Sequence, residues 1–364
     1  MKILKKIGLV TIYDEMNFGN RLQNYALQFF LQNTFNVKCV TLIADSSITR
    51  RSFFKVELLS LLAKTPFDFK KRSTIDLRYD KFRSFTRHYI KTKRFWGKSR
   101  IPQSVGDKFT FFIAGSDQIW NWTLPIVRRH EDDFFLSFAE KRKKNSYAAS
   151  FGIDTLNKEW IDFYRKHLNS FNRISVREDA GRKILSEIIN STAPVNIDPT
   201  LLLSSKEWEK IEKKPNSMKI DKPYILSYFL GNVGLVKEDI VQIASKHNLL
   251  QVDLLDESSL EYISGPSEFI YWIRHADFIC TDSFHATVFA IIFNKPFIVV
   301  SRKGMNSRIQ TLLKLCKLED HYVERSRIRE EDIRWNSKYK FVNKIIEQEK
   351  IKSINYFKRL LQEY

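Results

Sequence analysis

The stretch Asp277-Phe-Ile-Cys-Thr-Asp-Ser-Phe-His-Ala-Thr-Val-Phe-Ala-Ile-Ile292 decides the fold of this chain. A short apolar run ends in three polar residues, and a longer apolar run follows at once. This pattern predicts a buried strand, a tight turn and a buried helix. Asp282 or Ser283 can cap that helix, so we expect His285 in its first turn.

The turn between this strand and this helix is a candidate ligand site. In an open α/β sheet, ligands bind at the carboxyl ends of the strands. A titratable imidazole beside the free N–H groups of a helix N-terminus suits an anionic substrate. The alternative is that His285 is an ordinary buried histidine whose ring nitrogens are satisfied locally, and the rest of the chain has to decide between the two.

The composition is that of a folded and strongly basic protein. Of the 364 residues, 43% are hydrophobic and 14% aromatic, which is ample for two cores and excludes a disordered chain. Lys and Arg number 61 against 42 Asp and Glu, so the formal net charge is +19. That excess favours an anionic partner. Because no motif that reads DNA or RNA occurs, we expect a phosphorylated substrate or an acidic lipid surface, and no nucleic acid.

The cysteines and the N-terminus indicate the compartment. Cys39, Cys280 and Cys316 lack the spacing of a disulfide framework or a metal cluster, which indicates a reducing compartment and no metal site. The N-terminus is basic but has no apolar signal-peptide core, and no apolar run is long enough to cross a bilayer. We therefore expect a soluble cytoplasmic protein, with peripheral contact to the inner face of the plasma membrane as an open alternative.

The chain opens with a predicted strand, a glycine-bearing loop and a helix. Residues 7–12 are rich in β-forming side chains, and residues 21–31 carry apolar side chains at helical spacing. Asn17, Gly19 and Asn20 lie in the loop between them. The backbone N–H groups of such a loop can hold an anion or sugar hydroxyls, although Gly19 could equally be a plain turn residue.

Residues 46–96 have a different character. Arg and Lys are dense there, glycine is absent, and apolar residues recur at helical spacing. We predict basic amphipathic helices inserted into the first domain. A solvated helical face is one interpretation, and contact with an anionic membrane surface is the other. The recurring residues are Phe53, Leu58, Leu61, Leu62, Phe82, Phe85 and Tyr89.

Polar side chains follow the later strands of the first half. The predicted strand 109–114 runs directly into Gly-Ser-Asp-Gln, and the strand from residue 145 ends at Ser150. Small and polar side chains at that end of a strand suit a ligand crevice. Trp120 and Trp122 follow closely, and they could form a platform for a sugar ring or simply fill the core.

Arginines follow two further strands. Arg177 ends the predicted strand 174–177, where its fork suits a phosphate or carboxylate, and an ion pair with Glu178 or Asp179 is the alternative. A basic loop follows the predicted strand 296–300 and marks another anion site. Its positive charges come from Arg302, Lys303 and Arg308, and Asn306 lies between them.

Strands and helices alternate in two arrays along the chain. This argues for an α/β protein with two Rossmann-like domains facing across a cleft, an α-helical insert in the first and a closing helix at the C-terminus. No complete Gly-x-Gly-x-x-Gly fingerprint or Walker loop occurs, so NAD and ATP are not supported and we expect no cofactor. The expected domains are residues 1–205 and 223–335, joined by a Lys-, Glu- and Pro-rich linker at 206–222 and followed by C-terminal helices at 336–364.

Several stretches, taken together and in this order, resemble the polysaccharide pyruvyl transferase family. Each is weak alone, but the ordered set runs from near residue 7 to about residue 315. The resemblance implies a fold similar to GT-B glycosyltransferases. It also implies transfer of the enolpyruvyl unit of phosphoenolpyruvate onto two hydroxyls of a glycan, with release of phosphate. The stretches are Asn17-Phe-Gly-Asn-Arg-Leu-Gln-Asn-Tyr-Ala-Leu27, Gly115-Ser-Asp-Gln-Ile-Trp120, Ser146-Tyr-Ala-Ala-Ser-Phe-Gly152, Ser175-Val-Arg-Glu178, Asp198-Pro-Thr200, Thr281-Asp-Ser-Phe-His-Ala286 and Asn306-Ser-Arg-Ile309.

The resemblance also implies roles for individual residues. His285 matches the catalytic histidine of the family, Asp282 is a second catalytic candidate, and Arg177 matches an arginine that holds the donor. Many members have an arginine where this chain has Ser283, so either Arg302 or Arg308 replaces that phosphate ligand or the donor differs. The donor candidates are Arg177, Ser283, Arg302, Asn306 and Arg308, and the acceptor candidates are Asn17, Gly19, Asn20, Ser116, Asp117, Gln118, Trp120 and Ser150.

The implied acceptor is a sugar of a surface polysaccharide, such as an exopolysaccharide or capsule, or its lipid-linked precursor. Two other functions stay open from the sequence. A nucleotide-sugar glycosyltransferase on the same fold would hold a nucleotide diphosphate at residues 265–268 and in the loop around Gly304. A non-catalytic glycan-binding protein would bind the acceptor and turn over no donor.

Overall fold

The computed structural model describes residues 4–13, 16–46, 73–216, 222–232, 234, 236–302, 306–324, 327–333 and 339–364. The chain divides into two compact units, one made of Met1–Asn196 with Arg359–Tyr364 and the other of Ile197–Lys358. Each unit contains one five-stranded sheet in which all paired strands are parallel. The expected α/β class with two strand–helix arrays is therefore confirmed.

The sheet of the first unit has the strand order β3-β2-β1-β4-β5. This is the order of the Rossmann fold, in which the chain reverses its winding between β1 and β4. Ligands of such sheets bind at this switch point, outside the carboxyl ends of the two strands. The strands are β1 (Lys6–Val10), β2 (Lys38–Asp45), β3 (Thr92–Trp96), β4 (Phe111–Ala114) and β5 (Lys144–Ser146).

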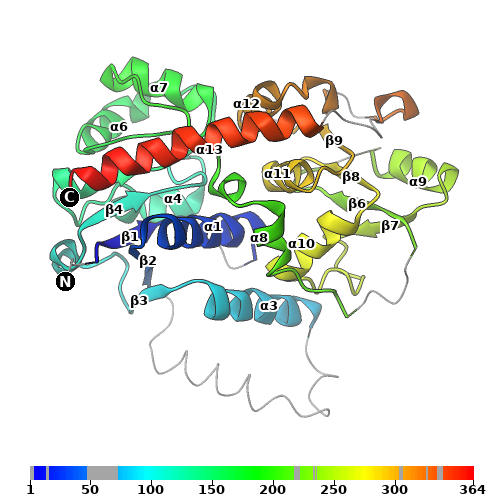
Figure 1. Ribbon diagram of the computed structural model, residues 1–364, viewed down its shortest axis with the longest axis horizontal. Coiled ribbons are helices and arrows are strands. Elements are labelled where there is room, and N and C mark those ends of the chain that lie inside the picture. The colour runs from blue at the N-terminus through cyan, green and yellow to red at the C-terminus, as the bar shows by residue number, and fades with distance from the viewer. Residues whose placement is uncertain are drawn as a thin grey trace, which may run out of the picture. The chain divides into compact units, whose positions relative to one another are not determined.

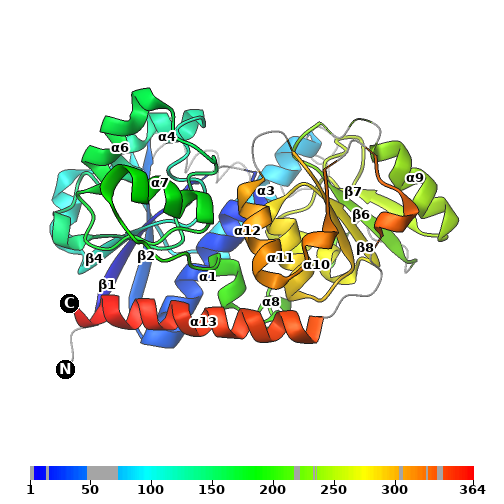
Figure 2. The same ribbon diagram turned by 90° about the horizontal axis from the view of Figure 1, so that it is seen from above.

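Helices cover both faces of this sheet. Figure 2 shows α1 (Phe18–Phe35) on one side of β1 and β2, and α6 (Ile161–Leu168) and α7 (Asp179–Ile189) on the other. Side chains alternate along a strand, so each face of the sheet presents its own apolar set to its own helices. Two short helices, α4 (Pro125–Arg129) and α5 (Glu131–Phe134), complete the second face.

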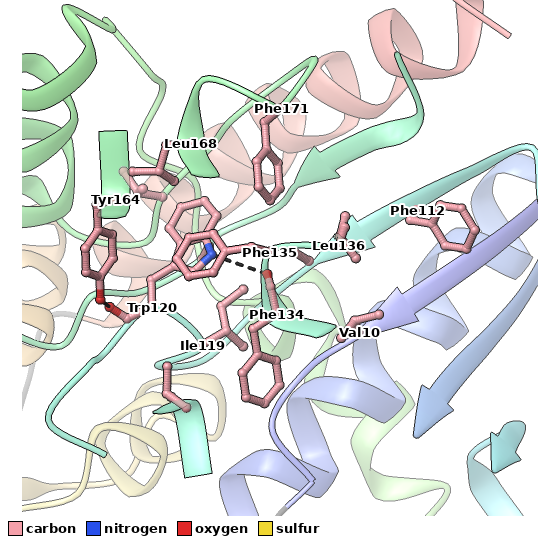
Figure 3. Close-up of a cluster of buried hydrophobic side chains, with 14 of the residues drawn as sticks. Val10, Phe112, Ile119, Trp120, Phe134, Phe135, Leu136, Tyr164, Leu168 and Phe171 are labelled. Atoms are coloured by element: carbon pink, nitrogen blue, oxygen red, sulfur yellow. Dashed lines mark hydrogen bonds between the residues drawn. The ribbon is translucent and has the colours of Figure 1, made fainter. Parts of the chain in front are cut away.

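The core on that second face is unusually aromatic, as Figure 3 shows. Trp120 is fully buried in it, with its ring stacked on Phe135 at a centroid distance of 6.0 Å. The Tyr164 hydroxyl donates to the Trp120 carbonyl oxygen at 2.5 Å. Trp120 is therefore a core residue, and its prediction as an acceptor contact is wrong, because tertiary packing encloses the ring.

The second unit has the strand order β10-β9-β8-β6-β7. In chain order this is 2-1-3-4-5, the flavodoxin-like arrangement, whereas the sequence suggested a Rossmann-like sheet. Its switch point lies between β6 and β8. The strands are β6 (Tyr224–Tyr228), β7 (Leu250–Asp253), β8 (Phe278–Thr281), β9 (Phe297–Val300) and β10 (Tyr322–Val323), and the last was not foreseen.

In this unit too, helices lie on both faces. Figure 1 shows α9 (Val236–Lys246) on one side of β6 and β8, and α11 (Phe284–Ile292) on the other. The helix α10 (Pro266–His275) packs against α11, and α12 (Ser307–Cys316) follows β9. Among the described residues, the short 3-10 helices are Gln103–Lys108, Lys141–Lys143, Lys158–Trp160, Pro199–Leu202, Glu319–His321 and Glu330–Asp332.

The boundary between the units differs from the predicted one. The first unit ends at Asn196, and the described part of the expected linker, residues 206–216, packs within the second unit. Helix α8 (Ser205–Glu209) places Trp208 against Phe289 of α11 at a ring distance of 4.8 Å, fully buried. The many Lys and Glu residues suggested a linker. The buried Trp208 side chain nevertheless packs this segment into the second unit.

The basic insert at residues 46–96 is partly strand. Helix α3 (Thr74–Tyr89) confirms helical structure there, with Phe82 and Phe85 buried. Residues 92–96, however, form β3, which pairs with β2 at the edge of the sheet. The predicted apolar residues Phe53, Leu58, Leu61 and Leu62 lie outside the described residues. The expected strand 174–177 is reduced to isolated bridges at Val176.

The C-terminus forms one long helix, α13 (Tyr339–Gln362). Its last residues belong to the first unit, where the Tyr364 ring stacks on Phe111 at 4.6 Å and Glu363 forms an ion pair with Arg173. Among the helices of the described residues, none has both the length and the apolar composition needed to traverse a membrane.

Replacing Trp208 tests whether residues 197–211 belong to the second unit. We expect Trp208→Ala to lower the free energy of unfolding by about 3 to 5 kcal/mol, because it leaves a large cavity beside Phe289. The control Lys206→Ala, exposed on the same helix, should change it by less than about 0.5 kcal/mol. Denaturant titration measures both free energies. A loss below about 1 kcal/mol for Trp208→Ala would mean that this segment is a linker and not part of the second unit.

The cysteines provide a second test of burial. Cys39, Cys280 and Cys316 are free and buried, and burial raises the pKa of all three thiols, that of Cys316 to about 12. A raised thiol pKa leaves almost no thiolate at pH 8, and only the thiolate is alkylated. We expect no reaction of the native protein with iodoacetamide at about pH 8 and three modified cysteines after denaturation, as counted by mass spectrometry. Rapid alkylation of the native protein would contradict the packing.

Candidate functional site

Each unit has a cluster of polar side chains at its switch point. In the first unit, Thr11 follows β1 and Ser116 follows β4. The Thr11 hydroxyl donates to the Ser116 carbonyl oxygen at 2.8 Å, and Gln23 of α1 donates to the Thr11 hydroxyl at 2.8 Å. These bonds tie the two strand ends and the first helix together where a ligand of this fold is expected.

Asp117 is the centre of the cluster in the first unit. Its Oδ1 accepts hydrogen bonds from the Gln118 amide at 2.9 Å and from Arg177 Nη2 at 3.3 Å. Its Oδ2 accepts from the side-chain amide of Asn20. The Arg177 side chain is only 1% exposed, so the pair is a buried one. Arg177 follows an isolated bridge at Val176 and does not end a regular strand as predicted, and its guanidinium pairs with Asp117.

Glu178 fixes the neighbouring turn. Its Oε1 accepts from the Ser150 hydroxyl at 3.0 Å and from the backbone amides of Phe151 at 2.8 Å and Gly152 at 3.3 Å. Gly152 has a φ of +63°, and a Cβ there would lie 2.1 Å from Gln118 Oε1. Glu178 was not among the predicted site residues, although it ends the quoted stretch Ser175-Val-Arg-Glu178. Its buried carboxylate holds the turn at residues 150–152 in place.

Two predicted acceptor residues have structural roles in α1. Asn17 is the N-cap, whose side chain accepts from the Asn20 amide at 3.1 Å. Gly19 lies inside the first turn of the helix and not in the predicted loop. The helix begins three residues earlier than its apolar spacing indicated because Asn17 supplies the cap. Asn20 remains in the cluster through its bond to Asp117.

In the second unit, Asp282 bridges the two strands at the switch point. Its Oδ1 accepts from the Leu230 amide at 2.6 Å and its Oδ2 from the Gly231 amide at 2.7 Å. The Thr281 hydroxyl adds a bond to the Tyr228 carbonyl oxygen at 2.5 Å. Both oxygens of Asp282 therefore hold the loop after β6, which is a positioning role and differs from the catalytic one expected for it.

The loop held by Asp282 supports Arg302. A Cβ at Gly231 would lie 2.8 Å from Arg302 Cδ and 3.0 Å from Asp282 Oδ2, so the arginine stem packs directly on this glycine. The Arg302 amide donates to Asn306 Oδ1 at 2.9 Å. Asn306 thus shapes the basic loop. Gly231 was missed as a site residue, and its place directly after a predicted strand was the available signal.

His285 occupies the first turn of α11, as expected. Ser283 is the N-cap of that helix, with its hydroxyl accepting from the Ala286 amide at 3.4 Å, which decides between the two predicted caps. The His285 ring meets the Phe284 ring edge-on at 5.2 Å. Its side chain is 9% exposed, and within the described residues Nε2 has no hydrogen-bond partner.

The carboxylate beside His285 is Asp198. Its Oδ2 lies 3.7 Å from His285 Nε2, and the Asp198 side chain is fully buried. Its Oδ1 accepts from the amide and the hydroxyl of Thr200 at 2.9 and 2.6 Å, which fixes the carboxylate. Asp198 was not predicted as a site residue, although the stretch Asp198-Pro-Thr200 was among those that suggested the family.

Arg308 completes the cluster of the second unit. It is the second residue of α12 and is mostly buried. Its guanidinium carbon lies 5.7 Å from the centroid of the Phe284 ring, which also contacts His285. The His285 imidazole thus has the Asp198 carboxylate beside it, and its neighbour Phe284 contacts the Arg308 guanidinium, a set of side chains of the kind used in acid–base chemistry on anions.

The bridging role of Asp282 can be measured directly. We expect Asp282→Asn to lower the free energy of unfolding by about 1 to 3 kcal/mol, because the amide cannot accept equally on both sides. Hydrogen exchange of the Leu230 and Gly231 amides should accelerate. Asp256→Asn is the control, since Asp256 is exposed and its carboxylate accepts hydrogen bonds from its near neighbour Ser258. Unchanged exchange at Leu230 in the Asp282 variant would contradict this role.

Solved structures of sugar-nucleotide enzymes are similar to this chain. UDP-GlcNAc 2-epimerase from Neisseria meningitidis, bound to UDP-GlcNAc, is 12% identical, with 98% of this chain and 94% of that chain covered and a TM-score of 0.44. A putative UDP-N-acetylglucosamine 2-epimerase from Listeria monocytogenes is 11% identical over 87% and 88%, with a TM-score of 0.46. The E. coli ADP-heptose LPS heptosyltransferase II is 9% identical over 94% and 99%, with a TM-score of 0.36.

No curated protein matches the sequence. The family model described as polysaccharide pyruvyl transferase, however, matches residues 17–304. That span includes the clusters around Asp117 and Asp282 and the pair formed by Asp198 and His285. Because the match covers most of the chain, the protein belongs to the polysaccharide pyruvyl transferase family.

Proposed function

We propose that this protein transfers the enolpyruvyl group of phosphoenolpyruvate onto a sugar of a surface polysaccharide or of its lipid-linked precursor. The observation that carries the proposal is the distance of 3.7 Å between Nε2 of His285, in the first turn of α11, and Oδ2 of Asp198. Membership of the family supports it. The pair lies where an imidazole can serve as an acid or a base near neutral pH.

The reaction requires two protons to be removed from the sugar hydroxyls and two to be delivered, one to the donor methylene and one to the departing phosphate. Protonation of the donor methylene makes the adjacent carbon an oxocarbenium-like centre, which a first sugar hydroxyl attacks with loss of its proton. Departure of phosphate then regenerates such a centre, and a second hydroxyl attacks it with loss of its own proton. The products are a cyclic pyruvate ketal and inorganic phosphate, and no oxidant or metal is needed for the balance.

His285 is the proposed acid that protonates the methylene and the base that receives a hydroxyl proton. Asp198, fixed by Thr200, orients the imidazole through Nε2. The N-terminus of α11 offers backbone N–H groups to an anion. The Arg308 guanidinium lies 5.7 Å from the Phe284 ring centroid, so it is the best candidate to replace the phosphate ligand that Ser283 does not provide.

The first unit is the proposed acceptor side. Its cluster presents amide, hydroxyl and carboxylate groups around Asp117, with Asn20 and Ser116 close by. Such mixed donors and acceptors suit sugar hydroxyls. In this arrangement Arg177 neutralises Asp117, and its proposed role shifts from holding the donor to shaping the acceptor side.

A variant at His285 tests the proposal. We expect His285→Ala to reduce acceptor-dependent phosphate release from phosphoenolpyruvate by about 10²- to 10⁴-fold, the usual contribution of a general acid–base residue. Asp198→Asn should lower kcat while leaving KM for the donor largely unchanged, because it acts through the histidine. His275→Ala, in the same unit and stacked on Tyr271, is the matched control and should retain full activity.

Full activity of a folded His285→Ala variant would overturn the mechanism. A thermal-shift comparison tests the donor separately. Stabilisation by phosphoenolpyruvate supports the proposal. Stabilisation by nucleotide sugars alone would favour a glycosyltransferase, and acceptor binding with no turnover of any donor would favour a glycan-binding protein.

A further inference from the structure

The first unit contains a cavity of about 240 Å³ at the carboxyl ends of β1 and β2. Thr11, which follows β1, and Asp45, which ends β2, both line it, and α4 and α5 close it on another side. Ligands of open parallel sheets bind outside the carboxyl ends of the strands. The cavity is smaller than the roughly 300 to 1,000 Å³ of drug-sized sites, so it suits a ligand of about one ring.

Thr11 connects this cavity to the cluster around Asp117. It lines the cavity, and its hydroxyl donates to the carbonyl oxygen of Ser116, the residue before Asp117, at 2.8 Å. The side chains assigned above to the acceptor cluster do not line the cavity themselves; they are Asn20, Ser116, Asp117 and Arg177. The cavity is therefore a neighbour of that cluster and not part of it.

His130 lines the cavity together with a carboxylate that faces its ring. Nδ1 of His130 lies 3.6 Å from Oδ2 of Asp133, whose side chain is 6% exposed. Oδ1 of Asp133 accepts from the Ile101 amide at 2.7 Å, which fixes the carboxylate. A carboxylate at Nδ1 favours the tautomer with its proton on that nitrogen, so Nε2 is left as an acceptor. This is the arrangement of a histidine that acts as a base.

The aromatic core anchors the backbone on both sides of His130, which lies between α4 and α5. Val127 and Phe134 are both buried in that core. The Phe134 carbonyl oxygen accepts from the Trp120 indole at 3.4 Å, and the Phe134 ring meets the His130 ring edge-on at 6.3 Å. Figure 3 shows Phe134 and Trp120 in this core. The imidazole is thus held at the border between core and cavity.

The charged groups of the lining occur mostly in opposite pairs. Arg94 and Asp45 lie 3.0 Å apart, and His130 faces Asp133. Arg129 adds one further positive charge at an exposed position. A lining without a large excess of one sign favours a polar ligand that carries few charges of its own. The lining combines hydrogen-bond donors and acceptors, and a sugar hydroxyl can match both.

We propose that this cavity holds the acceptor sugar and that His130 takes up the proton of one of its hydroxyls. The rings of Tyr13 and Phe134, which also line the cavity, offer aromatic contact area to the sugar. This role rests on the proposed function, in which two hydroxyl protons have to be removed. Because His285 gives one proton to the donor methylene and receives only one, the other hydroxyl needs a second base.

In this step the O–H bond of the sugar hydroxyl breaks as its oxygen forms a bond to the oxocarbenium-like carbon of the donor. Nε2 of His130 receives the proton, and Asp133 stabilises the imidazolium that results. The imidazolium then returns the proton to solvent, and the departing phosphate takes one proton from solvent. The step involves no oxidation or reduction. His130 is accordingly a catalytic residue, and Asp133 is a positioning residue.

Nuclear magnetic resonance of the full-length protein tests sugar binding without turnover. The probes are the methyl glycosides of glucose, galactose, mannose and N-acetylglucosamine, added without phosphoenolpyruvate. We expect at least one of them to shift the imidazole resonances of His130, which are assigned from their loss in His130→Gln. Those of His88 should not move, because His88 is exposed on α3 and does not line the cavity. No shift at His130 with any probe at about 20 mM would overturn the proposal.

Substitution of His130 tests the base. With the glycoside that binds, we expect His130→Gln to lower phosphate release from phosphoenolpyruvate by about 10²-fold or more, the usual contribution of a general base. His88→Gln is the matched control and should retain full activity, and circular dichroism checks the fold of each variant. Added imidazole should restore part of the rate of His130→Ala, because it can enter the emptied space and accept the proton. No rescue of the folded variant would assign the histidine a structural role.

Asp133→Asn separates the positioning role from packing. The amide keeps an oxygen for the Ile101 N–H group but turns a donor toward Nδ1 of His130. The imidazole then carries its proton on Nε2 and cannot accept another there as a neutral base. We expect kcat to fall by about tenfold or more while KM for phosphoenolpyruvate stays largely unchanged. An unchanged kcat would contradict the role of Asp133.

Failure of this proposal can be told apart from failure of the proposed function. If phosphate is released and folded His130→Gln releases it at the wild-type rate, the role of His130 fails and the proposed function stands. If a glycoside binds at His130 but the wild type releases no phosphate from phosphoenolpyruvate, the cavity is a sugar site. The base role then fails together with the proposed function.

Discussion

The Asp282 carboxylate holds the site of the second unit together. It accepts hydrogen bonds from two backbone N–H groups on the other side of the switch point. Asp282 at the end of β8 bonds to Leu230 and Gly231 after β6, which are separated from it by more than fifty positions along the chain. Two neighbouring amides satisfied by one charged group make short, strong bonds. This contact aligns the loop on which Arg302 packs and the turn from which α11 and His285 begin.

The first unit follows the same logic with different residues. Buried Glu178 accepts three hydrogen bonds from the turn after β5, and buried Asp117 joins Asn20 to Arg177. A buried carboxylate is tolerated only when such partners replace its hydration. In both units, therefore, acidic side chains build the frame of a strongly basic protein. The His285 imidazole and the Arg302 and Arg308 guanidinium groups follow the strands β8 and β9 of the second unit.

Much of this could be read from the sequence, because it depends on neighbours along the chain. The strand, turn and helix of residues 277–292 follow from local apolar spacing, and His285 lies in the first turn as the cap predicts. The two arrays and the family motifs are local too. The errors concern packing. Trp120 is enclosed by rings from several segments, and Trp208 binds an apparent linker to the second unit.

By itself, the sequence determined the α/β class, the family and the position of His285 in the first turn of its helix, because each depends on short-range pattern and ordered motifs. Only the tertiary structure decided which carboxylate serves which role. Asp282, a near neighbour of His285 in the sequence, bonds to the backbone of the loop after β6. Asp198, which is distant in the sequence, faces His285. Parallel strands must be joined by long crossovers, so the carboxyl ends that meet at a switch point come from remote positions. This geometry brings together residues that are far apart in the sequence, so no local sequence pattern predicts that they are close.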